Sequence, residues 1–210
     1  MHISDGVLPT SISAASFALT GIGVALSLRK IRQEDLPKIA VVTSSFFVAA
    51  LIHLPLGPTS VHLLLPGIVG ALLGPAAFLS IVVGLFLQSI LFQYGGLTAL
   101  GANALMMGVP SYLCGALFQS IRRDTYKTNS IAGAITGALG IVLSAIILAG
   151  LLFCSGEDFF GVAKIALAAH IPVIFIEAVI SAFIVSFIFR VKPEMLHHLG
   201  TPHHNDGSHA

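Results

Sequence analysis

The sequence predicts an all-α integral membrane protein, a bundle of about seven transmembrane helices, on three observations. Hydrophobic residues make up 56% of the 210-residue chain, charged residues only 9%, and the mean hydropathy is +0.97, whereas soluble domains carry about 25% charged residues. Several segments are apolar over the roughly 20 residues that a helix needs to cross a bilayer. Lys and Arg gather in alternate connections between those segments. The net charge of +1 gives no basic surface for nucleic acid, which excludes that class of partner.

Five apolar segments each have the length of one crossing. They are bounded by charged residues, Gly or Pro, and they run over 9–28, 39–56, 98–121, 130–153 and 165–189. A further apolar segment, 62–94, is too long for one pass, and Gly74-Pro75 interrupts it with two residue types that break helices. We therefore expect two short helices there, which brings the count to seven.

The basic residues predict the orientation. With seven passes, the connections after the first, fifth and seventh spans share one side of the membrane. They hold nine of the ten Lys and Arg residues, and Lys164 alone falls on the other side. Because Lys and Arg are enriched in cytoplasmic loops, we expect the N-terminus outside and the C-terminus in the cytoplasm.

The first residues, MHISDG, indicate a metal chelate rather than a signal peptide, since they lack a basic start and a small-residue cleavage site. The α-amine of Met1, the amide nitrogen of His2 and the imidazole of His2 offer three nitrogens in one short stretch. The amine and amide close a five-membered ring around a metal, and the amide and Nδ1 close a six-membered ring. With a fourth nitrogen, this set suits square-planar Ni(II) or Cu(II), whereas zinc prefers a tetrahedron.

A second histidine-containing stretch is predicted on the same outer side. HLPLGPTSVHLLLPG places His53 and His62 around a turn. His62 is the candidate fourth ligand, and the hydroxyl groups of Thr59 and Ser60 are placed to orient its imidazole. His53 either supports the site or caps the end of a span.

Four stretches then resemble the signature sequences of one family: MHISDGVLP, GPTSVHLLLPGIVGALLGP, GGLTALGAN and HIPVIFIEAVI. In order, from residue 1 to about residue 190, they look like the CbiM/NikM proteins, the substrate-binding S components of energy-coupling-factor transporters for cobalt and nickel. The resemblance implies that Met1, His2 and His62 bind Ni(II) or Co(II) as transported substrate, with the N-terminal loop tucked into the bundle. It also implies that Asn103 supports this region by hydrogen bonding, with helix capping as the alternative.

The same resemblance implies partners. These are a transmembrane coupling (T) subunit, cytoplasmic ATPase subunits and, in many members, a small accessory membrane subunit. The chain carries no G-x-x-x-x-G-K-[ST] motif for binding ATP. We therefore expect a non-catalytic subunit of an ATP-driven transporter, which captures the metal with high affinity at the plasma membrane of a prokaryotic cell.

Glu177 is the one carboxylate well inside a predicted span, and an intramembrane charge is a functional hypothesis by default. It either binds the metal directly or bonds a neighbouring helix or the N-terminal loop. Because nickel in a plane of four nitrogens needs no carboxylate, we expect the structural role.

The expected organisation is one transmembrane substrate-binding domain over 1–192, opening with a metal-chelating loop at 1–8, and a disordered cytoplasmic tail over 193–210. The tail region contains five of the nine histidines, which either buffer metal or have only incidental affinity for it. The alternative function is a metal-dependent intramembrane hydrolase. The sequence lacks H-E-x-x-H, G-x-S-x-G and paired carboxylates, which favours the transporter.

Overall fold

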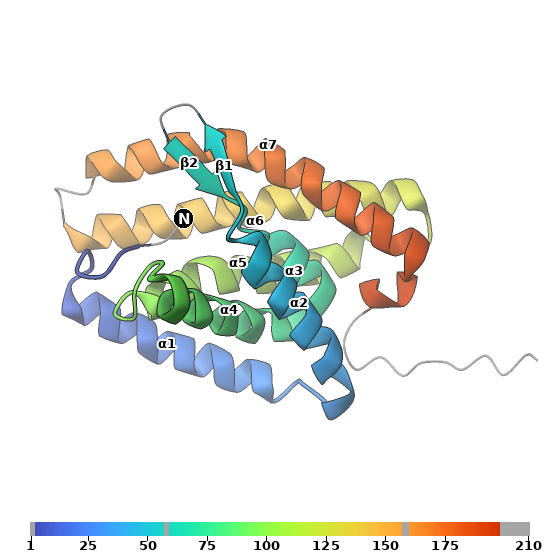
Figure 1. Cartoon of the computed structure of the whole chain (residues 1–210), viewed down its shortest axis with the longest axis horizontal. Coiled ribbons are helices and arrows are strands. Elements are labelled where there is room, and N and C mark those ends of the chain that lie inside the picture. Colours follow the sequence, from blue (N-terminus) through green and yellow to red (C-terminus); the bar gives the residue numbers. More distant parts are fainter. Residues whose placement is uncertain (1–2, 57–58, 157–159, 198–210) are drawn as a thin grey trace, which may run out of the picture.

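The computed structural model describes residues 3–56, 59–156 and 160–197, except for the side chains of 53–56, 59–62 and 166. A bundle of α-helices and one β-hairpin make up the described part (Figure 1). The elements are α1 (Thr10–Leu28), α2 (Leu36–Ala49), β1 (His53–Leu56), β2 (Thr59–His62), α3 (Pro66–Leu73), α4 (Ala77–Phe92), α5 (Leu100–Ile121), α6 (Tyr126–Ser155) and α7 (Phe160–Val191). Short 3₁₀ helices are η1 (Gln33–Asp35), η2 (Gly74–Ala76) and η4 (Pro193–Leu196).

The long apolar segment 62–94 is broken where the sequence predicts. α3 ends at Leu73, η2 follows, and α4 begins at Ala77. Pro75 has no N–H to continue the helix, and Gly74 has a positive φ of 50°. Every residue of α3 is buried, and this helix packs against α5 and α6 at the centre of the molecule. The prediction of two short helices is therefore confirmed.

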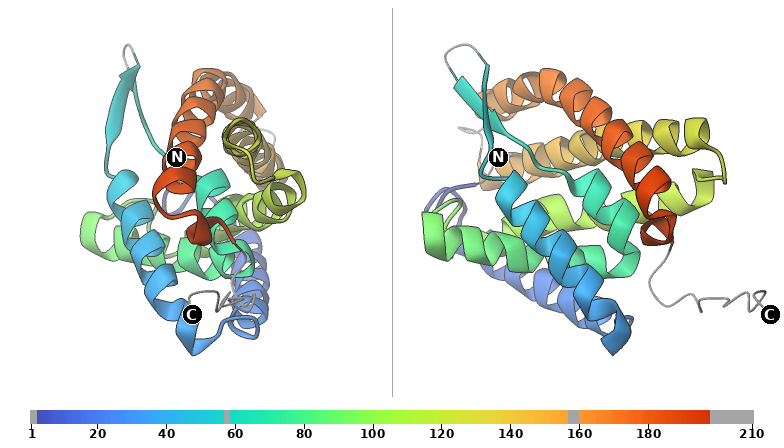
Figure 2. Two further views of the ribbon diagram at one scale, coloured as in Figure 1. Left: turned by 90° about the vertical axis from the view of Figure 1, so that its right-hand side faces the viewer. Right: turned by 45° about the vertical axis from the view of Figure 1, so that its right-hand side comes forward.

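The predicted span 39–56 is wrong at its C-terminal end. α2 stops at Ala49, and the chain then forms the antiparallel hairpin β1–β2, in which the Cα atoms of His53 and His62 are paired. Pro55 cannot continue a helix, and the residue before a proline favours an extended conformation. The fold thus contains a hairpin that the all-α prediction lacks, and it projects from one side of the bundle (Figures 1 and 2).

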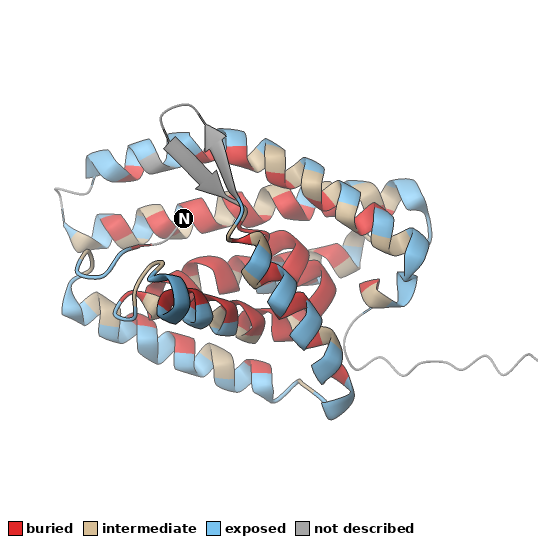
Figure 3. Cartoon of the chain, in the orientation of Figure 1, coloured by how far each residue is buried: buried red, intermediate tan, exposed pale blue. Residues whose placement is uncertain are grey.

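The outer faces of the helices are apolar. In α7, Phe175 and Phe183 are 69% and 73% exposed, whereas His170 and Glu177 are buried. Figure 3 shows exposed and buried residues interspersed along this helix. Soluble proteins rarely expose apolar patches on this scale, so these faces are suited to contact lipid. The chain therefore has the character of a multi-pass membrane protein.

In the part of the chain that the structure describes, five helical segments are long and apolar enough to cross a membrane. They are Thr10–Leu28, Pro66–Phe92, Leu100–Ile121, Tyr126–Ser155 and Phe160–Val191. In this count the broken segment from α3 to α4 is one candidate, and α2 is too short to qualify. Seven crossings, and the side of the membrane on which each terminus lies, stay predictions.

The three basic connections lie at one end of the bundle, as the charge pattern predicts (the right-hand end in Figure 1). Lys38 Nζ donates to the carbonyl oxygen of His197 at 3.0 Å, and Arg122 Nη1 donates to that of Leu196 at 2.8 Å. These contacts join the start of α2 and the end of α5 to the chain after α7. Leu196 is buried, so the packed chain extends past the predicted boundary at 192, while 198–210 lie outside the described residues.

Hydroxyl groups spaced seven residues apart hold α1 against the bundle. Because seven residues are about two helical turns, these groups share one face of the helix. Ser13, Thr20 and Ser27 donate to the carbonyl oxygens of Thr98, Gly101 and Pro75, respectively. The start of α1, and with it the N-terminal segment, is thereby fixed beside the start of α5.

Candidate metal-binding site

The predicted ligands adjoin the described part of the chain. Met1 and His2 lie outside the described residues, as do the side chains of His53, Thr59, Ser60 and His62. The structure describes the segments to which these groups are attached. One is the N-terminal segment, residues 3–9, and the other is the hairpin exit, residues 63–65.

Asn103 anchors the N-terminal segment. The backbone N–H of Ile3 donates to Asn103 Oδ1 at 2.8 Å, and Asn103 Nδ2 donates to the carbonyl oxygen of Ile3 at 3.0 Å. Both residues are buried, and a buried backbone group needs such a partner. These bonds of the Asn103 side chain go to Ile3 and not to its own helix. Asn103 therefore fixes the residue directly after Met1-His2, although its part in metal binding stays a prediction.

Asp5 anchors the same segment a second time, which sequence reasoning did not foresee. Its Oδ1 accepts hydrogen bonds from Thr98 Oγ1 at 2.6 Å, Thr98 N at 2.9 Å and Ala99 N at 3.3 Å. The bond from the Thr98 hydroxyl lowers the pKa of Asp5 below its usual value of 3.8, and the backbone N–H groups add to this. Asp5 is therefore ionised at neutral pH and ties the segment to the chain just before α5.

Glu177 anchors the hairpin exit. This fully buried residue of α7 accepts hydrogen bonds on Oε1 from the backbone N–H groups of Leu64, at 2.6 Å, and Leu65, at 2.9 Å. Leu65 has a left-handed conformation, with φ 48° and ψ 29°, which costs a residue other than Gly about 1–3 kcal/mol. Within the described residues Glu177 thus bonds backbone two and three residues after His62, whereas the structural partner expected from the sequence was a neighbouring helix or the N-terminal loop.

Gly137 of α6 allows α7, the helix that carries Glu177, to pack closely against α6. A side chain at Gly137 in α6 would overlap the side chain of Ser181, and its Cβ would lie 2.7 Å from the carbonyl oxygen of Glu177. Small residues at helix contacts allow such an approach within a membrane bundle. Gly137 therefore sets the position of the helix turn that carries Glu177.

The two anchored segments reach the same apolar core. Ile3, Leu64 and Leu65 are all members of the main buried hydrophobic cluster, so the two segments that carry the candidate nitrogens lead into the same water-poor interior. Among the described residues, no three His, Cys, Asp or Glu side chains are grouped so as to hold a metal ion. Asn103 and Glu177 accordingly hold backbone, and a metal site here depends on nitrogens from the segments they hold.

The chain is similar in sequence to known metal transport proteins. The family model CbiM, described as the cobalt uptake substrate-specific transmembrane region, matches residues 2–195. A putative metal transport protein of Haemophilus influenzae is 34% identical over 202 residues, which cover 93% of this chain and 97% of that protein. A putative fused nickel transport protein NikMN of Archaeoglobus fulgidus is 31% identical over 210 residues, which cover 96% of this chain and 70% of that protein.

A solved structure shares the fold. The crystal structure of a transition metal transporter is 25% identical in sequence and superposes with a TM-score of 0.74, covering 91% of this chain and 93% of the other. A truncated transition metal transporter superposes with a TM-score of 0.72 over 90% of this chain and 99% of the other, and its 24% identity supports the fold alone.

Proposed function

This chain belongs to the CbiM family of cobalt uptake substrate-specific transmembrane proteins, and from that membership we propose that it captures Ni(II) or Co(II) for import as the specificity subunit of an energy-coupling-factor transporter. Relatives are named as nickel and cobalt transport proteins, which supports the choice of metal. High affinity, ATP-driven coupling and location in a prokaryotic plasma membrane are parts of this proposal.

Four nitrogens form the proposed site: the Met1 amine, the His2 amide, the His2 imidazole and the His62 imidazole. Such a set favours Ni(II), and Co(II) accepts the same donors with added ligands. The observation that carries the proposal is the two-way hydrogen bond between Asn103 and Ile3. It fixes the backbone directly after the chelating residues, so the chelate would be formed on a positioned segment.

The hairpin supplies the fourth nitrogen in this scheme. Glu177 holds the backbone at Leu64 and Leu65, which supports a fixed placement of the nearby His62. Thr59, Ser60 and His53 are proposed to orient the histidines. No catalytic step is assigned to the chain.

Transport needs partners, because the sequence has no ATP-binding motif. A coupling subunit in the membrane and cytoplasmic ATPases would reorient the loaded subunit and open the site to the cytoplasm, with an accessory membrane subunit assisting. Alternating exposure of one fixed site is how transporters prevent a leak.

The test is Ni(II) binding by isothermal titration calorimetry to purified full-length protein that keeps Met1 as its free N-terminus. It is compared with a variant that has one alanine added before Met1 and with His62→Ala. The extension keeps every side chain but displaces the terminal amine. His170→Ala serves as a control histidine, because it lies in α7 and is not one of the proposed ligands.

We expect the extension and His62→Ala each to weaken Ni(II) binding at least about 100-fold, because each removes one of four nitrogen donors, while His170→Ala binds as the native chain does. Acid should also weaken binding, since the amine, with a pKa of about 7.7–8.0, must lose its proton. Unchanged affinity in the extended protein would rule out the N-terminal chelate.

A further inference from the structure

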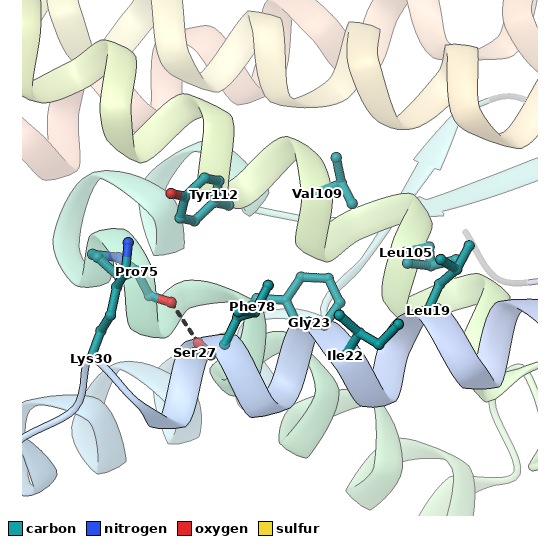
Figure 4. A pocket seen from close by; sticks show the side chains of 11 residues that line it. Leu19, Ile22, Gly23, Ser27, Lys30, Pro75, Phe78, Leu105, Val109 and Tyr112 are labelled. Atoms are coloured by element: carbon teal, nitrogen blue, oxygen red, sulfur yellow. Dashed lines mark hydrogen bonds between the residues drawn. The ribbon is translucent and has the colours of Figure 1, made fainter.

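An apolar groove runs along α1 on the membrane-facing side of the bundle. It encloses about 510 Å³ between α1, the start of α4 and α5 (Figure 4), a volume within the about 300–1,000 Å³ of small-molecule sites. Phe78, which is almost fully buried, forms its floor, and the exposed side chains of Ile22 and Leu26 form a rim. The groove therefore opens towards the hydrocarbon of a bilayer.

The dimensions suit a single hydrocarbon chain. From Leu19 to Lys30 the groove follows α1 for about 16 Å, and from Leu105 to Tyr112 it follows α5 for about 10 Å, at 1.5 Å per residue. One leaflet of a bilayer has about 15 Å of hydrocarbon.

The backbone of α1 contributes to the shape of the floor. Gly23 lines the groove, and a Cβ there would lie 2.6 Å from Cε1 of Phe78. The ring therefore packs against bare backbone. Ser27, one turn further along, is tied to the carbonyl oxygen of Pro75 (Figure 4), which fixes α1 against the other wall. The groove is thus built from positioned elements rather than from loose side chains.

One end of the groove is charged. Lys30 and Tyr112 lie together at the end opposite Leu19 and Leu105 (Figure 4), with Lys30 Nζ 6.0 Å from the centre of the Tyr112 ring. The salt bridge found in the described residues joins Arg32 to Glu34 and leaves Lys30 without a carboxylate partner there. This end belongs to the basic end of the bundle. The groove is apolar over about the depth of one leaflet and ends at the unpaired ammonium group of Lys30. This combination complements a lipid with an anionic headgroup.

We propose that this groove binds one anionic phospholipid of the surrounding membrane, with an acyl chain along Phe78 and the headgroup phosphate at Lys30. The Lys30 stem lies along the apolar wall and its ammonium group reaches the headgroup level, as amphipathic side chains do at membrane interfaces. The bound lipid fills the space between α1 and α5. It therefore stabilises the docking of α1, the helix that follows the N-terminal segment.

The test measures lipids retained by the full-length protein in native mass spectrometry, after exchange into micelles with equal amounts of phosphatidylglycerol and phosphatidylcholine of identical acyl chains. Lys30→Gln removes the charge, with Lys192→Gln as its matched control, an exposed lysine at the same end that does not line the groove. Val109→Phe fills the groove, with Val179→Phe as its control, a lipid-facing position of α7. Circular dichroism checks that each variant is folded.

We expect one phosphatidylglycerol per chain in the native protein. Lys30→Gln should lower its preference over phosphatidylcholine about fivefold, Val109→Phe should abolish retention of both lipids, and neither control should change it. Should Val109→Phe fail the folding check, the comparison of Lys30→Gln with Lys192→Gln decides. Equal retention of the two lipids by the native chain, or equal effects of the two lysine changes, overturns the proposal. So does a Val109→Phe variant that keeps its lipid but no longer co-purifies with co-expressed membrane partner subunits, because the groove is then a protein interface.

Discussion

The N-terminal segment and the hairpin exit are held by different chemistry. Asn103 meets both the N–H and the carbonyl group of Ile3 through a neutral carboxamide, and Asp5 adds a second, exposed attachment. At the hairpin exit one buried oxygen of Glu177 accepts from two successive N–H groups. The N-terminal segment therefore has two attachments, whereas the hairpin exit depends on one carboxyl group.

This difference has consequences for how each segment tolerates change. A buried N–H group that loses its partner costs about 1–3 kcal/mol, and the two N–H groups at the hairpin exit share a single acceptor. The left-handed Leu65 adds strain that only the surrounding contacts can hold. The hairpin exit should therefore fail as a unit when its anchor is removed, whereas the N-terminal segment should weaken in steps.

The largest effect is expected from Glu177→Ala. It leaves the N–H groups of Leu64 and Leu65 without a partner in the core, at about 1–3 kcal/mol each. The free energy of unfolding should fall by about 2–6 kcal/mol and Ni(II) binding should weaken at least about tenfold, as measured by thermal unfolding and calorimetry.

Glu177→Gln is the informative companion, since it keeps an oxygen acceptor for both N–H groups and should lose less than half as much stability. Glu194→Ala, which removes an exposed carboxylate of η4, should change neither measurement. If Glu177→Gln retains full stability but loses Ni(II) binding, the carboxylate is a ligand and not an anchor.

Asn103→Asp should have the next largest effect. A carboxylate can still accept from the Ile3 N–H but cannot donate to its carbonyl group, which leaves one buried acceptor unpaired at about 1–3 kcal/mol. We expect Ni(II) binding to weaken about tenfold, because the segment after the chelating residues is less well fixed.

Asn129 offers a matched control for Asn103. Both are 2% exposed, and Asn129 Nδ2 donates to the carbonyl oxygen of Arg123 at the basic end of the bundle. Asn129→Asp should lower thermal stability without changing Ni(II) affinity. Equal losses of affinity in the two variants would mean that Asn103 acts through global stability alone.

A smaller effect is expected at Gly96, which has a φ of +89° and faces Asp5. Gly96→Ala introduces left-handed strain of about 1–2 kcal/mol, and its methyl group would also overlap the Asp5 carboxyl group. Gly6→Ala introduces the same strain at φ +80° with nothing within 4 Å of the added atom. Calorimetry should show weaker Ni(II) binding in Gly96→Ala than in Gly6→Ala, and equal affinities would show that the Asp5 attachment does not matter.

The sequence predicted the elements better than it predicted the anchors. Hydropathy located the long helices because lipid-facing surfaces leave a signal at every exposed position, as in Phe175 and Phe183, and Gly74-Pro75 marked the break between α3 and α4. The hairpin was missed because its apolar residues continue the hydropathy of α2, so the predicted span was extended to residue 56. The pairing of backbone groups in a hairpin leaves no comparable signal in the sequence.

The candidate site shows the same limit. Glu177 stood out as a carboxylate in an apolar helix and Asn103 through the family resemblance, so their importance could be predicted, but their partners could not. Those partners are backbone groups of Ile3, Leu64 and Leu65, and every residue carries such groups. The left-handed conformation of Leu65 was equally invisible, because it is imposed by tertiary contacts on a residue that does not favour it.

The smallest effect is expected from Asp5→Asn, and its pH dependence is the informative part. The folded structure lowers the pKa of Asp5, so its contribution to stability is complete above the unfolded value of about 3.8 and is lost only as the pH falls through the lower folded value. An unperturbed α-amine, with a pKa of about 7.7–8.0, and an unperturbed imidazole, with a pKa of about 6.5, titrate at much higher pH. Titration of Ni(II) affinity from pH 5.5 to 8.5 should therefore show a slightly lower affinity in Asp5→Asn with an unchanged midpoint.

A shifted midpoint in that titration would contradict the division of roles between anchors and ligands. Asp5 is ionised throughout the range, so as an anchor it contributes the same amount at every pH and lowers the whole curve by one factor when replaced. As a ligand or close neighbour of the metal, its negative charge would alter the proton affinity of the amine and imidazole nitrogens, and removing it would move their titration. The position of the midpoint, rather than the loss of affinity, thus decides whether Asp5 anchors the segment or lies close to the metal.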